Sequence, residues 1–268
     1  MRQKSILRKI AAGVAVFAMA FSMLSPVSVK AAEKVSYPEK QVVYQTNKNG
    51  GGSVYFSINN IPKGQKVLKV TSSKNSVAKP YYIYESNNDY SEKYLDKEMS
   101  QYNYSGVSRY AEFGLRAFKK GTATISYRIG KSDKSYKTYK TKLSVYAYEN
   151  PIESLTITGV NSGKNLASAF KTSNSPYEKT KPVTKNQSNG KITVRGNTNW
   201  KITNINFSND YDNSYMYISY PQNAAKSKVT LPVGKLKAGK SGYVHINLYN
   251  TKTGGTQRCT YHIAGNVN

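Results

Sequence analysis

Hydrophobic and polar residues alternate along most of this chain in short runs that are bounded by Gly, Asn, Ser or Pro. In the run 122–129, Ala123, Ile125, Tyr127 and Ile129 fall on one side of an extended chain. A period of two is typical of strands that bury one face of a sheet and expose the other. The runs in the first half are Gln41–Gln45, Ser53–Ile58, Lys66–Thr71, Val77–Tyr84, Ala111–Phe118, Thr122–Ile129 and Lys140–Tyr148.

A second set of alternating runs begins immediately after Pro151, which interrupts strand pairing. The turn sequence Asn250–Gly255 separates the last two runs and is a strong hairpin signal. Two sets of about seven short strands predict two tandem β-sandwiches, with boundaries at residues 33–149 and 151–268. The runs in the second half are Ile152–Thr158, Gly190–Arg195, Trp200–Ile205, Tyr215–Tyr220, Ser227–Leu231, Gly242–Tyr249 and Thr256–Ile263.

Two segments of the first half carry a recognisable pattern. Residues 66–78 read KVLKVTSSKNSVA, a strand followed by S-S-x-x-x-V-A, and residues 114–125 read GLRAFKKGTATI, which ends in A-x-x-x-G-T-A-T-I. Together they resemble the bacterial Ig-like (Big) repeat over roughly residues 35–148. That resemblance implies an Ig-like β-sandwich of the kind found in adhesins, surface-layer proteins and cell-wall enzymes, and it implies no single activity. The sequence departs from the family by an insertion at residues 85–106.

The second half lacks this pattern, but residues 189–202, NGKITVRGNTNWKI, resemble the Trp-bearing strand pair of several extracellular Ig-like sandwiches. The sequence therefore predicts an all-β chain of two tandem Ig-like β-sandwiches.

The N-terminus has the three parts of a secretory signal peptide. A basic start leads into the apolar stretch Ile10–Leu24, and small residues precede a cleavage site after Ala31. A retained membrane anchor is the alternative, but the apolar stretch is shorter than the roughly 20 residues that span a bilayer. No later segment is apolar enough to span a membrane. The sequence thus predicts that residues 1–31 are removed and that a Gram-positive-type cell secretes the rest.

Positive charge dominates the composition, with a formal net charge of +26 for the whole chain. Without residues 1–31 the chain has 35 Lys and Arg against 14 Asp and Glu, a net charge of +21. Export argues against nucleic acid as a partner, so we expect an anionic cell-wall polymer, an anionic glycan or another surface protein. No lipid-anchor Cys follows the cleavage site, which favours non-covalent attachment. The alternative is that the charge only keeps the protein soluble.

Groups that perform catalysis are few. The imidazoles are His245 and His262, and the thiol is Cys259. A hairpin turn centred on residues 253–254 would place His245 opposite His262, but two ligands are fewer than zinc requires. Cys259 lies on the same face of its strand as Tyr261 and Ile263 and is expected to be buried. The sequence therefore predicts no enzyme, no cofactor and no metal site.

The insertion interleaves tyrosines with five of the fourteen acidic residues. It is open to three interpretations: a calcium loop, whose ligand spacing matches no EF-hand, a ligand-contact loop in which Tyr supplies area at low entropic cost, and a poorly ordered segment. The candidate contact residues here are Tyr84, Tyr90, Tyr94, Tyr102 and Tyr104.

Tyrosine is the most unusual feature of the composition, at 24 residues. Tyr211, Tyr215 and Tyr217 share one parity in the second half, so we expect them on one face. Sheet packing accounts for many tyrosines without a ligand, and exposed rings can also stack on sugars. The sequence predicts an exported adhesion or structural module of the cell surface, with a carbohydrate-binding accessory protein as the alternative.

Overall fold

The structure, a computed structural model, describes residues 34–62, 64–86, 110–177, 180–211 and 215–265, without the side chains of 82–86. The predicted signal peptide lies outside these residues, and so does the insertion apart from the backbone of its first two positions. None of the helices in the described residues is both long and apolar enough to cross a membrane.

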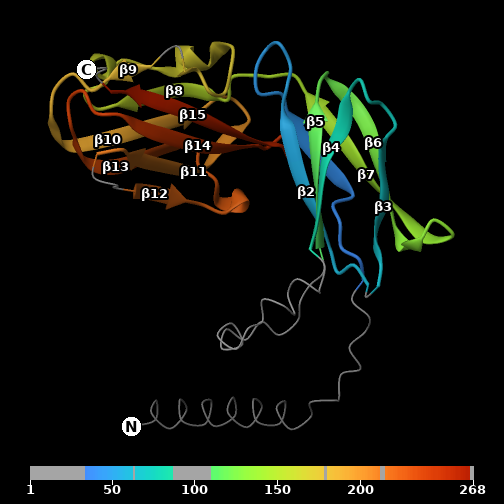
Figure 1. The fold of residues 1–268 in the computed structure, drawn as a ribbon. Helices are drawn as coiled ribbons and strands as arrows, with labels where there is room; N and C mark the ends of the chain where they lie inside the picture. Colours follow the sequence, from blue (N-terminus) through green and yellow to red (C-terminus); the bar gives the residue numbers. More distant parts are fainter. Residues whose placement is uncertain (1–33, 63, 87–109, 178–179, 212–214, 266–268) are drawn as a thin grey trace, which may run out of the picture. The chain divides into compact units, whose positions relative to one another are not determined.

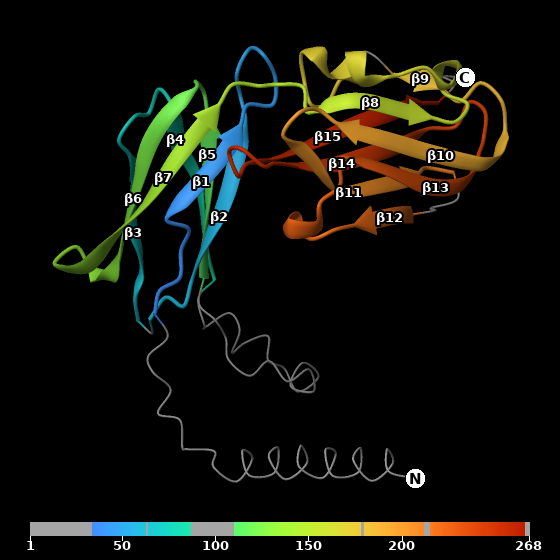
Figure 2. The same cartoon turned by 180° about the vertical axis from the view of Figure 1, so that it is seen from behind.

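The first half forms two sheets that follow an Ig-like strand order (Figure 1). One sheet has the order β2-β5-β4, and the other has the order β1-β7-β6-β3, in which β1 runs parallel to β7 (Figure 2). When the strands are lettered along the chain, these are the B-E-D and G-F-C sheets of an Ig domain, with the first strand added beside G. The strands are β1 (Lys40–Tyr44), β2 (Ser53–Asn59), β3 (Lys66–Ser72), β4 (Ala78–Ser86), β5 (Tyr110–Ala117), β6 (Gly121–Ser132) and β7 (Ser135–Tyr146).

The second half repeats this architecture with a different edge strand. Its sheets have the orders β13-β10-β8 and β12-β11-β14-β15-β9, which correspond to E-B-A and to C′-C-F-G with β9 added beside G. Short 3₁₀ helices lie between strands of the described residues, among them Asn161–Gly163, Ala167–Lys171 and Gln222–Ala224. The strands are β8 (Ile152–Ile157), β9 (Lys181–Pro182), β10 (Gln187–Gly196), β11 (Trp200–Asn209), β12 (Tyr215–Ser219), β13 (Lys228–Leu236), β14 (Gly242–Asn250) and β15 (Thr256–Ala264).

The predicted all-β, tandem Ig-like fold is confirmed, and each predicted run coincides with a strand. The pattern missed β9, which is two residues long and contains Pro182. It also missed the start of β7, where both faces are polar from Ser135 to Thr138 and the period of two disappears.

Large aromatic and aliphatic side chains fill both sandwiches. In the first half, Tyr127 of one sheet lies 5.4 Å from Phe113 and 6.3 Å from Phe56 of the other sheet, measured between ring centroids. In the second half, Trp200 and Phe207 belong to a buried cluster to which strands of both sheets contribute. Each core therefore joins its two sheets through side chains of alternating strand positions, and burial of this apolar surface stabilises the fold.

Residues around the predicted boundary at Pro151 are bonded to the second half. The indole Nε1 of Trp200 donates a 2.6 Å hydrogen bond to Glu149 Oε1, and Asn250 donates to the same oxygen. The Tyr44 ring lies 4.9 Å from the Trp200 ring, and its hydroxyl is hydrogen-bonded to Thr253. Backbone bonds also join residues 46–48 to residues 172–174. Hydrogen bonds therefore join the second half both to the segment between β7 and β8 and to residues at the end of β1 and just after it.

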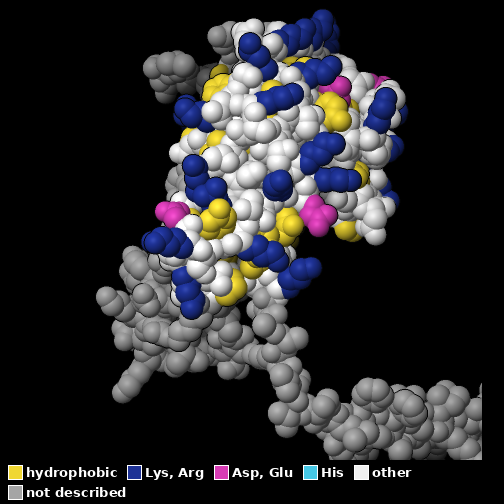
Figure 3. Space-filling view, turned by 90° about the vertical axis from the view of Figure 1, so that its right-hand side faces the viewer, with side chains coloured by type: hydrophobic (Ala, Val, Ile, Leu, Met, Phe, Trp, Pro, Cys, Tyr) yellow, Lys and Arg dark blue, Asp and Glu magenta, His cyan; other side chains and the backbone are white. Residues whose placement is uncertain are grey.

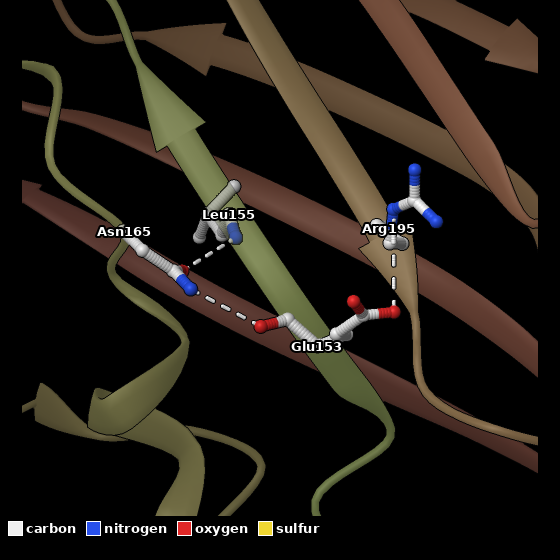
Figure 4. Close-up of polar contacts among 4 residues, drawn as sticks. All are labelled: Glu153, Leu155, Asn165 and Arg195. Carbon is white, nitrogen blue, oxygen red and sulfur yellow. Dashed lines mark hydrogen bonds and ion pairs between the residues drawn. The ribbon is translucent and has the colours of Figure 1, made fainter.

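A side-chain amide covers part of the free edge of β8, which ends the three-stranded sheet (Figure 4). Asn165 accepts a hydrogen bond from the Leu155 N–H and donates one to the Glu153 carbonyl, as a neighbouring strand would. Glu153 also lies 4.0 Å from Arg195, the ion pair found within the described residues. Both charged side chains are exposed, so the ion pair adds little stability. The Asn165 amide, in contrast, satisfies backbone groups of β8 that could otherwise pair with a strand of another molecule.

The contact between Phe113 and Tyr127 generates a stability prediction. Phe113 is fully buried and bridges the sheets of the first half, so Phe113→Ala should lower the free energy of unfolding by about 3–5 kcal/mol. Phe118 is 43% exposed, and Phe118→Ala should cost about 1 kcal/mol or less. Urea unfolding followed by circular dichroism measures both. Equal losses for the two variants would contradict this description of the core.

Candidate functional site

The outer face of the five-stranded sheet presents aromatic, amide and hydroxyl side chains, and we term it the tyrosine face. Val244, Ile246 and Leu248 of β14 point into the core and are fully buried, so the residues between them point outward. The described members of the face include Tyr215, Tyr217 and Ser219 of β12, Lys201, Asn204, Asn206 and Ser208 of β11, Tyr243, His245, Asn247 and Tyr249 of β14, and Arg258, Thr260 and His262 of β15.

Strand register arranges these side chains in rows across the sheet. One row contains Tyr215, Ser208, Tyr243 and His262, and the next contains Tyr217, Asn206, His245 and Thr260. Because neighbouring strands lie about 4.8 Å apart, each row is about 14 Å long.

The rings on this face lie close to one another. Tyr243 is stacked on His262 with ring centroids 4.8 Å apart, and its ring is nearly parallel to that of His245, with centroids 6.2 Å apart. Tyr177, from the segment before β9, lies 6.4 Å from His262 and is 63% exposed. On β12, Tyr215 and Tyr217 lie 5.8 Å apart and are 58% and 65% exposed. The face is therefore a flat aromatic surface with its most exposed rings at its two margins.

His245 occupies a partly buried position in the middle of the tyrosine face. Its Nδ1 lies 3.0 Å from Thr260 Oγ1, within hydrogen-bond distance. Burial lowers the pKa of His245, and the positive charge of Arg258 lowers it further. The imidazole is therefore neutral at pH 7, so it can donate one hydrogen bond and accept another.

The predicted juxtaposition of His245 and His262 is wrong. Register pairs His245 with Thr260, and His262 with Tyr243. The turn is shifted from its predicted centre because the Asn250 side chain accepts hydrogen bonds from the N–H groups of Lys252 and Thr253. Within the described part of the chain no cluster of three or more His, Cys, Asp or Glu could hold a metal ion.

Cys259 is fully buried between the sheets, as predicted from its parity, and burial raises the pKa of its thiol. The side chain is thus a protonated core group that water does not reach.

Of the other predicted contact residues, Tyr211 lies away from the tyrosine face. Its hydroxyl donates a 2.8 Å hydrogen bond to the Lys235 carbonyl, and the Lys237 ammonium lies 4.9 Å from its ring centroid. The expectation that Tyr211 shares a face with Tyr215 and Tyr217 is wrong because Tyr211 follows the end of β11 and does not belong to β12. Tyr90, Tyr94, Tyr102 and Tyr104 lie outside the described residues, and so does the side chain of Tyr84.

The outer face of the four-stranded sheet of the first half has a different chemistry, and we term it the lysine face. None of its strands, β1, β3, β6 and β7, contains Asp or Glu. Figure 3, which views the side of the molecule where β3 and β6 are drawn in Figure 1, shows many Lys and Arg side chains and few acidic ones. Its outward basic residues include Lys40, Lys66, Lys69, Arg128, Lys140 and Lys142, and they lie among Thr71, Thr122, Thr124, Ser126, Thr138 and Ser144.

A hollow of about 220 Å³ opens on the lysine face, lined by Lys69, Thr71, Ser126, Arg128 and Thr138. The guanidinium of Arg128 is half-buried and lies 4.4 Å from the centroid of the Tyr136 ring, which holds it at the sheet surface. Two cations and three hydroxyl groups around one hollow form an arrangement that can bind a phosphate or carboxylate group.

Sequence reasoning expected Tyr215 and Tyr217 on one face but did not find the rest of the tyrosine face, and it missed the lysine face although part of its signal was present. The run 122–129 places Thr122, Thr124, Ser126 and Arg128 opposite its apolar face, and Thr138, Lys140 and Lys142 repeat the pattern in β7. These two sets become one surface only through the register of β6 with β7. Tyr177 carries no strand pattern and gave no signal.

Comparisons with known proteins assign no family to the chain. No protein-family model matches it, and no curated protein sequence matches it, so the Big-repeat resemblance remains a prediction. Domains 5-6 of the S-layer protein SbsC share 12% identity with it, over 88% of this chain and 98% of that chain, with a TM-score of 0.28. The Ig1-2 module of the Drosophila receptor protein tyrosine phosphatase DLAR has 12% identity, 87% and 98% coverage and a TM-score of 0.31. The C-terminal domain of the Streptococcus agalactiae AgI/II polypeptide BspA has 7% identity, 84% and 95% coverage and a TM-score of 0.23.

The position of His245 generates a pH prediction. Its pKa is lowered in the folded chain by burial and Arg258, whereas the unfolded chain has the ordinary value of about 6.5. Between about pH 7.5 and about pH 5 the unfolded state takes up the proton first, so stability should fall as the pH falls. The urea midpoint of the unmodified protein should therefore drop over this range, and the drop should be smaller in His245→Gln.

Thr260→Val is the matched comparison, because it removes the hydroxyl partner and leaves the buried imidazole in place. This variant should keep the pH-dependent drop. The same drop in the unmodified protein and in His245→Gln would show that another group is responsible.

Proposed function

We propose that this chain is an exported binding or structural module of the cell surface, held without a covalent bond by anionic cell-wall polymers. The mature protein would consist of two tandem Ig-like modules, residues 33–149 and 151–268, after removal of residues 1–31. The observation that carries this proposal is the lysine face, where basic and hydroxyl side chains alternate on strands without any acidic residue.

The chemistry of the lysine face fits a phosphate-bearing polymer. Row by row, Lys69 lies beside Arg128, Lys140 beside Ser126, and Lys142 between Lys40 and Thr124. Phosphates repeated along a flexible polymer can contact several of these cations at once, and each contact releases bound counterions. Ser and Thr hydroxyls between the cations donate hydrogen bonds to phosphate oxygens. No catalytic role is proposed for either face.

The alternative is a carbohydrate-binding accessory protein that binds its ligand through the tyrosine face. Its binding should persist at high ionic strength. The lysine face predicts the opposite, because exposed charges are screened over roughly 8–10 Å at physiological ionic strength.

Binding to immobilised poly(glycerol phosphate) tests the proposal. The unmodified protein should bind at about 50 mM NaCl and lose most of its affinity by about 500 mM. Neutralising four outward cations of the lysine face should weaken binding at low salt by at least about tenfold. The four changes are Lys69→Gln, Arg128→Gln, Lys140→Gln and Lys142→Gln.

The control variant removes the same net charge from exposed positions of the second half. It carries Lys185→Gln, Lys191→Gln, Lys228→Gln and Lys252→Gln, and it should keep most of the affinity. If both variants weaken binding equally, the charge acts from the whole surface and the lysine face is not the site. Binding that is unchanged at high salt would contradict the electrostatic mechanism.

A further inference from the structure

The tyrosine face differs from the lysine face in carrying almost no charge. Its strands β12 and β14 contain no Lys, Arg, Asp or Glu. Lys201 of β11 lies toward one end of the face. Arg258 of β15 lies beside Asn247, in the row next to the one that contains Tyr217 and His245, and it is the cation nearest the centre of the face among these strands. In a chain with a net charge of +26, an uncharged surface of this kind is suited to an uncharged ligand.

The side chains of this face combine flat rings with hydrogen-bonding groups. Tyr215 and Tyr217 present exposed rings at the β12 margin, and Tyr177 presents one at the opposite margin. Between them lie amides, hydroxyls and the neutral imidazole of His245. Aromatic rings with an apolar face and nearby donors and acceptors match a pyranose ring, which has apolar C–H faces and a rim of hydroxyl groups.

An acceptor at the centre of the face lacks a donor. The Oδ1 atom of Asn206 is buried and has no hydrogen-bond partner among the described residues. Register places Asn206 between Tyr217 and His245. An unsatisfied buried acceptor costs free energy, and a small movement of the side chain would let a ligand hydroxyl satisfy it.

We propose that the tyrosine face binds a neutral polysaccharide, which crosses the strands from Tyr215 and Tyr217 on β12 toward His262 and Tyr177. The row length of about 14 Å accommodates a chain of several sugar rings. Stacking on Tyr rings supplies contact area, while Asn206, Ser208, Asn247 and Thr260 supply hydrogen bonds. This proposal rests on the alternative, carbohydrate-binding function of the tyrosine face and names its ligand class, and it does not depend on the lysine face.

The two histidines of the chain make a direct test possible. Both lie on the tyrosine face, and the chain contains no others, so every imidazole signal in an NMR spectrum reports on this surface. The probes are soluble hexasaccharides: cellohexaose, maltohexaose, mannohexaose and the hexamer of N-acetylglucosamine. At about 0.5 M NaCl, where charge is screened, at least one probe should shift the imidazole signals saturably. Addition of poly(glycerol phosphate) should leave them unchanged, so the two proposals fail separately.

The variant Tyr215→Ala/Tyr217→Ala should weaken binding of that hexasaccharide by at least about tenfold, because two stacking rings are lost. The control Tyr55→Ala/Tyr81→Ala removes two exposed rings from the other half and should bind normally. Fluorescence of the single, buried Trp200 shows whether each variant is folded. Absence of imidazole shifts with every probe, or undiminished binding by the Tyr215/Tyr217 variant, overturns the proposal.

Two other occupants are separated by the same measurements. Imidazole shifts that depend on protein concentration without any sugar would identify a second copy of this chain as the occupant. Capture on cell walls stripped of phosphate polymers, abolished both by Tyr215→Ala/Tyr217→Ala and by protease treatment of the walls, would identify a protein. Either result overturns the polysaccharide proposal.

Discussion

A strand that buries every second side chain must present the others to water, and this constraint shapes the whole molecule. Each half closes its core with two sheets, so each sheet has one face against the core and one face outside. The core faces are occupied by Ile, Val, Leu and aromatic residues, which leaves little freedom there. The side chains that differ in charge and polarity between the halves therefore lie on the outer faces, at the strand positions that do not pack in the core.

The outer faces of the two G-F-C sheets illustrate how far the same scaffold can diverge. In the first half, β6 and β7 alternate core residues with Thr, Ser, Lys and Arg, and the surface is cationic. In the second half, β11 and β14 alternate core residues with Asn, Ser, Tyr and His, and the surface is neutral. A shared strand order thus supports two outer surfaces of different charge, and neither surface alters the core that holds the sheets together.

The period of two was sufficient to predict the strands and to decide which residues point inward, as the burial of Cys259 and Tyr127 confirms. It was insufficient to predict register, because alternation is unchanged when a strand slides by two residues. The offset between β14 and β15 is set by the Asn250 side chain in the turn, a local hydrogen-bonding detail. Hence the predicted pairing of His245 with His262 failed while their common face was correct.

The alternation of hydrophobic and polar residues also could not predict contacts between residues far apart in the sequence. Glu149 receives hydrogen bonds from Trp200 and Asn250, which lie 51 and 101 positions further along the chain. A single carboxylate in a short connecting segment carries no periodic signal. The tyrosine and lysine faces could be predicted strand by strand, but only sheet order brings their members onto one surface.

The parallel pairing of β1 with β7 has a mechanical consequence. These strands begin and end the first half, and their register runs from Lys40 opposite Lys142 to Tyr44 opposite Tyr146. Tension applied through the two ends of this half pulls the strands in opposite directions along their length, so the interstrand hydrogen bonds are loaded in shear and must break together. In the second half, the parallel pair of β9 with β15 spans only two residue pairs. The parallel pairing is therefore more extensive in the first half, where five residue pairs share a load that runs along the strands.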